Sequence, residues 1–259
     1  LLCCTACSKD EESFKGKDAD ASLSIAVKAV GSAVTKGVHP NDENELAGEA
    51  KVNNLSVLVF DESGAQLIGY GWQATNSEGE ASILNVPAMT MRAQIVIVSN
   101  TPENSLAGVT SYSDFESKLA QLADQSQSNL VMSSPVITTQ APLVKGDNYL
   151  GYASMGSENI NGIAEPVEIT RLAARLDLVN VKTDFTKTLL RNRTVRVEEV
   201  TILNQSTASR FFSRDYWGVV MATGHLGNSG ATALNRDIAN GSPINDTPYV
   251  HLSLIHISE

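Results

Sequence analysis

Few side chains in this chain have the types and spacing that catalysis or metal binding needs. The cysteines all lie near the start, so from Ser8 to Glu259 no thiol is present to form a disulfide, a zinc knuckle or a nucleophile. The histidines fall in no HExxH or comparable metal spacing: His39, His225, His251 and His256. The GxSxG, GxxxxGK(S/T) and GxGxxG motifs are absent, and no motif surrounds Asp215 and His225. We therefore predict no catalytic residue, no metal and no cofactor, and a protein that is not an enzyme.

The first residues have the order of a lipidation site. Leu1-Leu2 resembles the end of an apolar signal segment, Thr5-Ala6 is a pair of small residues, and the sequence becomes polar and acidic from Ser8. This order resembles a bacterial lipobox, in which the cysteine, here Cys7, becomes the new N-terminus and carries lipid. Cys4 departs from the pattern, because an aliphatic residue is usual at that place. The alternative is a group of incidental cysteines in a buried segment. We also expect that the chain lacks its true start.

The net charge and the linker after Cys7 limit which binding partners and which cellular location are expected. With 19 Lys and Arg against 29 Asp and Glu, the formal charge is -10, which argues against nucleic acid or anionic lipid. No later segment approaches the roughly 20 apolar residues that span a bilayer, so the lipid would be the only anchor. Residues 8–21 form a polar linker, in which Lys9-Asp10-Glu11 resembles the signal that sends Bacteroidota lipoproteins to the outer face of the outer membrane. An ordinary solvated linker is the alternative.

Alternation with period two dominates the rest of the chain and predicts strands. The apolar residues Leu23, Ile25, Val27 and Ala29 alternate with more polar ones, as in a half-buried strand. A polar loop at residues 31–48 follows. Further strands are expected at residues 54–60, 82–86 and 92–98, with a glycine-rich piece between the first two. The segment 92–98 is nearly continuous in aliphatic residues, so we expect it to lie centrally and to be covered on both faces.

One helix is predicted among the strands. Ser113 and Glu116 have the spacing of a capping box, in which the serine oxygen accepts an N–H group and the glutamate reaches back. Phe115, Leu119 and Leu122 follow at helical spacing. We predict a helix near residues 113–125 whose narrow apolar face packs on a sheet.

A second block of strands begins after Pro166, at residues 167–181 and 194–203. Many short strands with turn residues between them are typical of antiparallel sandwiches and not of βαβ folds. We predict a mainly β fold of two antiparallel β-sandwich domains, at residues 22–165 and 166–259, with the helix on the first. The second domain is expected to be incomplete.

The order of these elements resembles the Bacteroidota fimbrillins of the FimA/Mfa type, the subunits of type V pili. The resemblance runs from Cys7 to about Phe185 and implies transthyretin-like domains. No single motif is strong, and the shared order is the basis. Its components are the lipobox with Ser8-Lys9-Asp10, the strand Leu23–Val30, Val34-Thr35-Lys36-Gly37, Asn54–Phe60 with Gly64, Ile95–Asn100, Asn148–Tyr152 and Thr170–Arg175.

The resemblance implies a mechanism of polymerisation. The precursor travels as a lipoprotein to the outer membrane, and a trypsin-like or Arg-specific protease cuts the loop after the first strand. Loss of that strand opens a groove, which a C-terminal strand of another subunit fills. Here the displaced strand would contain Leu23, Ile25, Val27 and Ala29. The implied location is a surface-exposed fimbrium that supports adhesion.

Lys36 is the best candidate for the cleavage residue, with Gly37 after the cut, because the loop around it is polar and proteolysis concentrates in exposed loops. Many fimbrillins have arginine at this place, and an ordinary solvated lysine is the alternative. Lys28 is a poorer candidate because it would lie inside the strand. Arg171 and Arg175 are expected to pair with carboxylates at the domain junction.

Two alternatives to a polymerising subunit stay open. One is a pilus tip or anchor protein, in which the first strand stays in place and the lipid is permanent. The other is a glycan-binding surface lipoprotein, which the aromatic content of 5% weakens. At the far end, Ser253–Glu259 resembles translated sequencing-adapter DNA, with a genuine final strand as the alternative.

Overall fold

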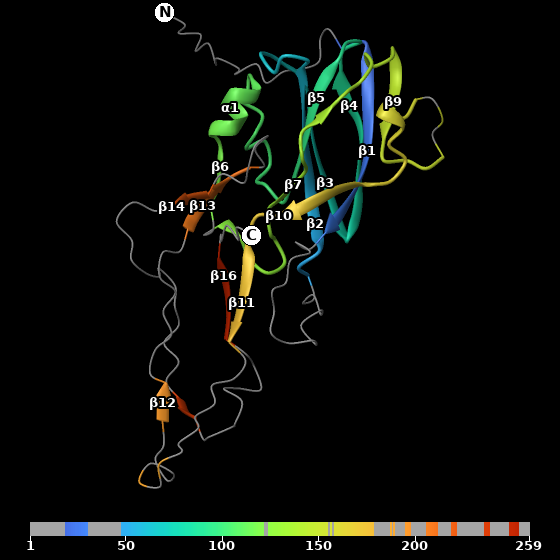
Figure 1. Cartoon of the computed structure of the whole chain (residues 1–259). Helices are drawn as coiled ribbons and strands as arrows, with labels where there is room; N and C mark the ends of the chain where they lie inside the picture. The colour runs from blue at the N-terminus through green and yellow to red at the C-terminus, as the bar shows by residue number, and fades with distance from the viewer. Residues whose placement is uncertain are drawn as a thin grey trace, which may run out of the picture.

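The structure is a computed structural model that describes residues 19–30, 48–121, 124–154, 156, 158–178, 187, 189, 195–197, 206–211, 219–221, 236–238 and 249–253. In this part of the chain the fold is mainly β, as predicted. Its largest element is a nine-stranded sheet (Figure 1). The main path of the sheet follows the order β3 (Leu67–Glu78), β2 (Lys51–Asp61), β5 (Ala93–Ser99), β7 (Met132–Ser133), β10 (Val167–Arg171), β1 (Ala21–Val30) and β4 (Glu80–Ala88).

Two further strands complete this sheet, which contains both parallel and antiparallel pairs. β8 (Ile137–Thr138) pairs with β5, and β9 (Gly146–Leu150) pairs with β1. Most pairs are antiparallel, but β1 runs parallel to both β9 and β10. The antiparallel prediction is therefore wrong at β1. The physical reason is that β9 and β10 reach β1 through long connections and not through hairpins, so either direction is open to them.

The two ends of the sheet approach each other because β3 contains glycine where a side chain would collide with β4. A Cβ atom on Gly69 would lie 2.1 Å from the carbonyl oxygen of Pro87, and one on Gly71 would lie 2.8 Å from a methyl carbon of Val86. Glycine inside a strand often marks such a close approach. The glycine-rich piece of the sequence is thus the strand β3, which the pattern of side chains did not predict.

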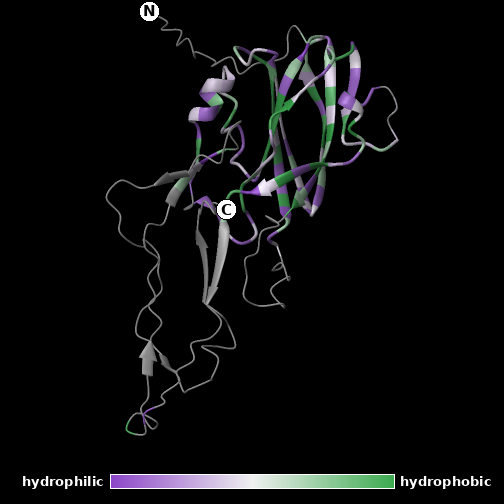
Figure 2. Cartoon of the chain, in the orientation of Figure 1, coloured by the Kyte–Doolittle hydropathy of each residue, from purple (hydrophilic) through white to green (hydrophobic). Residues whose placement is uncertain are grey.

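Apolar side chains gather on both faces of β2 and β5. Inside the rolled sheet, alternate residues of β2 and β5 join those of β1, β4, β9 and β10 in one core cluster. On the other face, the remaining residues of the two strands pack against the helix α1 (Tyr112–Ser117) and its neighbouring loops. Every residue of β5 is buried, which confirms its predicted central place. Figure 2 shows the hydrophobic residues concentrated in the strands of this sheet.

The helix is shorter than predicted and begins elsewhere. Its N-cap is Ser111, whose side chain accepts a hydrogen bond from the Asp114 backbone N–H at 3.1 Å, so Ser113 is not the cap. The helix ends at Ser117, because Lys118 is extended and Leu119–Gln121 form the strand β6. β6 pairs with β13 (Ser206–Arg210). The predicted helix at 113–125 is therefore wrong beyond Ser117, where pairing with a distant strand replaces helical hydrogen bonds.

The predicted strand 167–181 is divided at Leu172. Its first part, β10, belongs to the nine-stranded sheet, although it follows the expected boundary near Pro166. Its second part, β11 (Ala174–Leu178), pairs with β16 (Tyr249–Ser253). Two more short pairs are β12 (Val195–Val197) with β15 (Arg236–Ile238), and β13 with β14 (Val219–Met221). The division into two sandwich domains stays a prediction, and residues 254–259 lie outside the described part.

Candidate functional site

The first strand, β1, is bounded by other strands along both of its edges. On one edge β4 pairs with it from Ala21 to Lys28. On the other edge β9 pairs with Ala21–Ile25, and β10 pairs with Val27–Val30. The position of β1 in the sheet is therefore internal, and its removal would leave three strands without their hydrogen-bonding neighbour.

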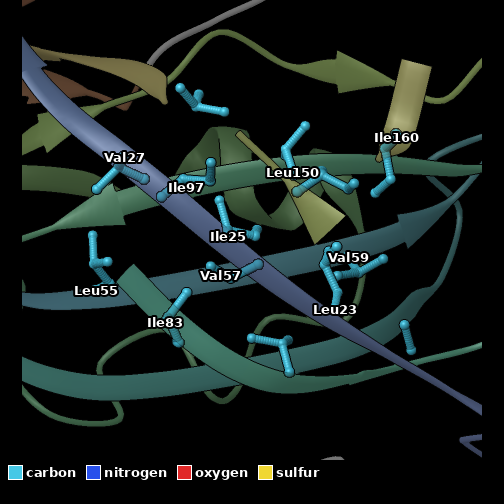
Figure 3. Close-up of a cluster of buried hydrophobic side chains, with 14 of the residues drawn as sticks. Leu23, Ile25, Val27, Leu55, Val57, Val59, Ile83, Ile97, Leu150 and Ile160 are labelled. Atoms are coloured by element: carbon cyan, nitrogen blue, oxygen red, sulfur yellow. The ribbon is translucent and has the colours of Figure 1, made fainter. Parts of the chain in front are cut away.

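One face of β1 is fully buried. Leu23, Ile25 and Val27 have 0% exposed surface, and Ala29 packs partly buried against the same cluster. Figure 3 shows the first three pointing among side chains from five other elements, namely Leu55, Val57, Val59, Ile83, Ile97, Leu150 and Ile160. The predicted alternation of β1 is confirmed, and its apolar residues fill the centre of the core.

The start of β1 is held by polar contacts to two neighbouring segments. Thr90 N–H donates to the Asp20 carboxylate at 2.8 Å, and this hydrogen bond is the main cause that lowers the pKa of Asp20 from its ordinary value of 3.8. Ser22 donates from its hydroxyl to Asp147 at 2.7 Å, and the Asn148 side-chain amide donates to the Ser22 carbonyl at 3.1 Å. The two bonds to Ser22 tie the start of β1 to β9.

The chain changes from β9 to β10 beside the middle of β1. Between the two pairings, Gly151 has a φ of +85°, and a Cβ atom there would lie 2.7 Å from the carbonyl oxygen of Ala26. A residue with a side chain would clash with the β1 backbone and would be strained in this conformation. Gly151 therefore allows one edge of β1 to be shared by two strands.

The predicted site residues are only partly within the described chain. Cys7, Lys36 and Gly37 lie outside the described residues. Lys28 is an exposed residue within β1, in register with Glu80 on β4 and Glu168 on β10, which confirms that it lies inside the strand.

The expected arginine pairing is confirmed for Arg171. Its guanidinium lies 3.2 Å from the Glu49 carboxylate, and the side chains are 16% and 5% exposed, respectively. Arg175 lies in β11, of which the structure describes the backbone course alone. The Glu49–Arg171 pair joins the turn at Gly48–Ala50, directly after the predicted cleavage loop, to the end of β10.

Within the described residues, no group of three or more His, Cys, Asp or Glu side chains is arranged to hold a metal ion. In the same residues, no helix is long and apolar enough to cross a membrane. A hollow of about 380 Å³ lies between the loop after β5 and the strand β6, with Glu103, Lys118 and Asp124 at its sides and Leu106 and Phe211 among its apolar lining. The sequence contained no pattern that pointed to this hollow.

Two family models together match nearly all of this chain. Residues 21–171 match the model described as "Major fimbrial subunit protein (FimA)". Residues 172–256 match the model described as "Fimbrium tip subunit Fim1C-like, C-terminal domain". The first match begins at the first residue of β1 and ends at the last residue of β10. This chain belongs to the FimA family of major fimbrial subunit proteins, which confirms the fimbrillin resemblance.

Relatives with longer chains agree with this assignment. A Parabacteroides distasonis protein named "Putative fimbrium tip subunit Fim1C" is 45% identical over 97% of this chain and 67% of its own length. The "Major fimbrium subunit FimA type-2" of Porphyromonas gingivalis is 26% identical over 82% of this chain and 51% of its own. The chain thus spans two thirds of the first relative and about half of the second. Both relatives are named as fimbrial subunits.

Solved structures show the same fold. A crystal structure of a "putative cell adhesion protein" from Parabacteroides distasonis has a TM-score of 0.82 and 42% identity, over 93% of this chain and 72% of that one. A fimbrilin of Porphyromonas gingivalis has a TM-score of 0.53 at 19% identity, over 76% of this chain and 53% of that one. The second likeness is one of fold alone.

Proposed function

We propose that this protein is a structural subunit of a surface fimbrium that polymerises by donor-strand exchange and supports adhesion. It is exported as a lipoprotein modified at Cys7, anchored to the outer membrane through that lipid, and matured by cleavage between Lys36 and Gly37. Its partners are other fimbrial subunits and a trypsin-like or Arg/Lys-specific protease. The observation that supports this proposal is the internal position of β1, paired on both edges and directly followed by the segment that contains Lys36.

The energetics of β1 favour replacement of a lost strand. When β1 is absent, the apolar surface that Leu23, Ile25 and Val27 cover becomes exposed. The cost is roughly 1.5–3 kcal/mol for each of the three side chains. The facing edges of β4, β9 and β10 lose their backbone partners at the same time, and such edges pair readily with another chain. A strand from another subunit restores both by β-augmentation.

A tip subunit is the second candidate, because the 45% identical relative and the C-terminal family model both have that description. In this alternative β1 stays in its place and the lipid is permanent.

A glycan-binding function is less favoured. Tyr70 and Trp72 on β3 are half-buried, and the Tyr70 hydroxyl and Trp72 Nε1 are shielded from solvent. Burial also raises the pKa of Tyr70. These rings therefore offer little exposed platform for a sugar.

Limited trypsin digestion of the full chain, followed by N-terminal sequencing, tests the cleavage step. We expect a new N-terminus at Gly37, which Lys36→Ala abolishes. Lys28→Ala is the matched control and should leave the cut unchanged, because Lys28 lies in β1. An unchanged cleavage pattern in Lys36→Ala would contradict the assignment.

Addition of a Ser22–Val30 peptide to the cut chain separates the two candidates. A polymerising subunit should lose thermal stability after cutting and regain it with the peptide, because a ligand that binds the native state alone stabilises it. A tip subunit that keeps β1 should keep its melting temperature and should not bind the peptide.

Lipidation is tested by labelling with a palmitate analogue. The Cys7→Ala variant should lose the label, and the Cys4→Ala variant should keep it.

A further inference from the structure

The strand β4 contains a β-bulge opposite Ser24. Leu23 is in register with Val86, and Ile25 is in register with Ile83. Between these pairs, β1 contributes Ser24 alone whereas β4 contributes residues 84 and 85. Two residues opposite one define a β-bulge, which is a specific local feature of a sheet.

The backbone of the bulge is suited to its residue type. Asn85 has a φ of 56°, in the left-handed region that asparagine enters more readily than most residues. The residue type at position 85 therefore favours the backbone conformation that the bulge requires.

Side chains from β1 and β3 satisfy the N–H groups of the bulge. The Asn85 N–H donates to the Ser24 hydroxyl oxygen on β1 at 3.3 Å. The Leu84 N–H donates to the Gln73 side-chain oxygen on β3 at 3.2 Å. Gln73 lies on β3, which stays in place during the exchange, whereas Ser24 belongs to the strand that donor-strand exchange replaces. When β1 leaves, Asn85 loses its acceptor and Leu84 keeps its own.

The space at Ser24 is small. Strict alternation would turn Ser24 away from the core, yet it is only 6% exposed and lies between the fully buried Leu23 and Ile25. On the β9 side, Ser24 is in register with Tyr149. A long side chain at this position would have to displace its neighbours, which costs stability in well-packed sites.

We propose that the β4 bulge sets the register of the incoming donor strand and selects its sequence. The strand taken up is a segment of another fimbrial subunit with a serine or threonine between two larger apolar residues, so that its hydroxyl accepts the Asn85 N–H. If the donor strand is shifted by one residue, an apolar side chain lies against the bulge and the hydroxyl lies in the apolar core. Such a register is unfavourable because it buries a polar group and removes an apolar one from the core. This inference rests on the proposed donor-strand exchange and adds its specificity.

Hydrogen exchange in the intact full chain tests the contact without any exchange of strands. Ser24→Ala should speed amide exchange at Asn85 at least about fivefold, because the N–H loses its acceptor. Ser24→Thr should keep the protection. Ser22→Ala is the matched control, since the Ser22 hydroxyl bonds Asp147 and not the bulge. Unchanged exchange at Asn85 in Ser24→Ala would overturn the inference.

Peptide competition on the full chain cut after Lys36 tests the selection. A peptide of Ala21–Val30 should enter, the same peptide with Ser24→Thr should match it, and peptides with Ser24→Ala or Ser24→Leu should bind about tenfold more weakly or worse. Equal binding of all four overturns the selection while leaving donor-strand exchange in place. Failure of every peptide, including the native one, overturns donor-strand exchange itself, and with it this inference.

Discussion

The phenyl ring of Phe211 stacks on that of Phe115, with ring centroids 5.5 Å apart and planes inclined by 20°. Phe211 directly follows β13, and Phe115 lies in α1, which precedes the β6 strand that β13 pairs with. Both rings belong to the cluster on the outer face of β2 and β5. The stack therefore joins the segment matched by the tip-subunit model to the segment matched by the FimA model.

Phe211→Ala should lower the free energy of unfolding by about 3 kcal/mol, because it removes a large buried ring and leaves a cavity beside Phe115. Phe211→Leu should cost less than Phe211→Ala, since it keeps part of the volume. Leu189→Ala is the control, because Leu189 is 90% exposed and its loss should change little. Urea denaturation of the three variants measures the differences, and equal stability of Phe211→Ala and Leu189→Ala would contradict the role of the stack.

Gly69→Ala should destabilise the protein by about 3 kcal/mol or more, because the new methyl group would lie against the backbone oxygen of Pro87, which cannot move without shifting β4. The matched change Gly108→Ala should be nearly neutral, since a Cβ atom there meets nothing within 4 Å. Thermal denaturation of both variants measures the contrast. A Gly69→Ala protein with the melting temperature of wild type would show that β3 and β4 do not approach as described.

Breaking the Glu49–Arg171 ion pair should lower the free energy of unfolding by about 3 kcal/mol, because a largely buried charge loses the opposite charge beside it. A double-mutant cycle with Glu49→Gln and Arg171→Met should give a coupling energy of about 1 kcal/mol or more, as is usual for residues in one ion pair. The same cycle on Arg92 and Glu62 is the control. Those side chains are 47% and 60% exposed at 3.0 Å, so their coupling should be near zero.

The hydrogen bond from Thr90 to Asp20 should make stability depend on acid pH. Because the pKa of Asp20 is lower in the folded state than its ordinary value of 3.8, its contribution is present above pH 3.8 and is lost as the pH falls through the folded pKa. Asp20→Asn should therefore lower the melting temperature at about pH 6 and have a smaller effect at about pH 2. A difference between the two proteins that stays constant across this range would count against a charge-dependent bond.

Local patterns were sufficient to predict β1 and β5. Alternation in β1 and a continuous aliphatic run in β5 predict which faces are buried. The structure agrees at Leu23, Ile25 and Val27 of β1 and at every residue of β5, whereas Ala29 is half-buried. The same reasoning failed at β3, whose Gly69 and Gly71 have no side chains to show a pattern. It also failed after Ser117, where the helix ends although apolar residues at helical spacing extend to residue 122 in the sequence.

The sequence by itself determined that the described fold is mainly β, that β1 is amphipathic and that a polar segment follows it, because these properties depend on neighbouring residues. Only the tertiary structure decided which strands border β1, that Gly151 passes against Ala26, and that Ser24 lies opposite a bulge. These relationships join groups far apart in the chain, such as the Ser24 hydroxyl and the Asn85 backbone N–H. Hydrogen bonds between backbones depend on register and close approach, which side-chain patterns along one strand do not specify.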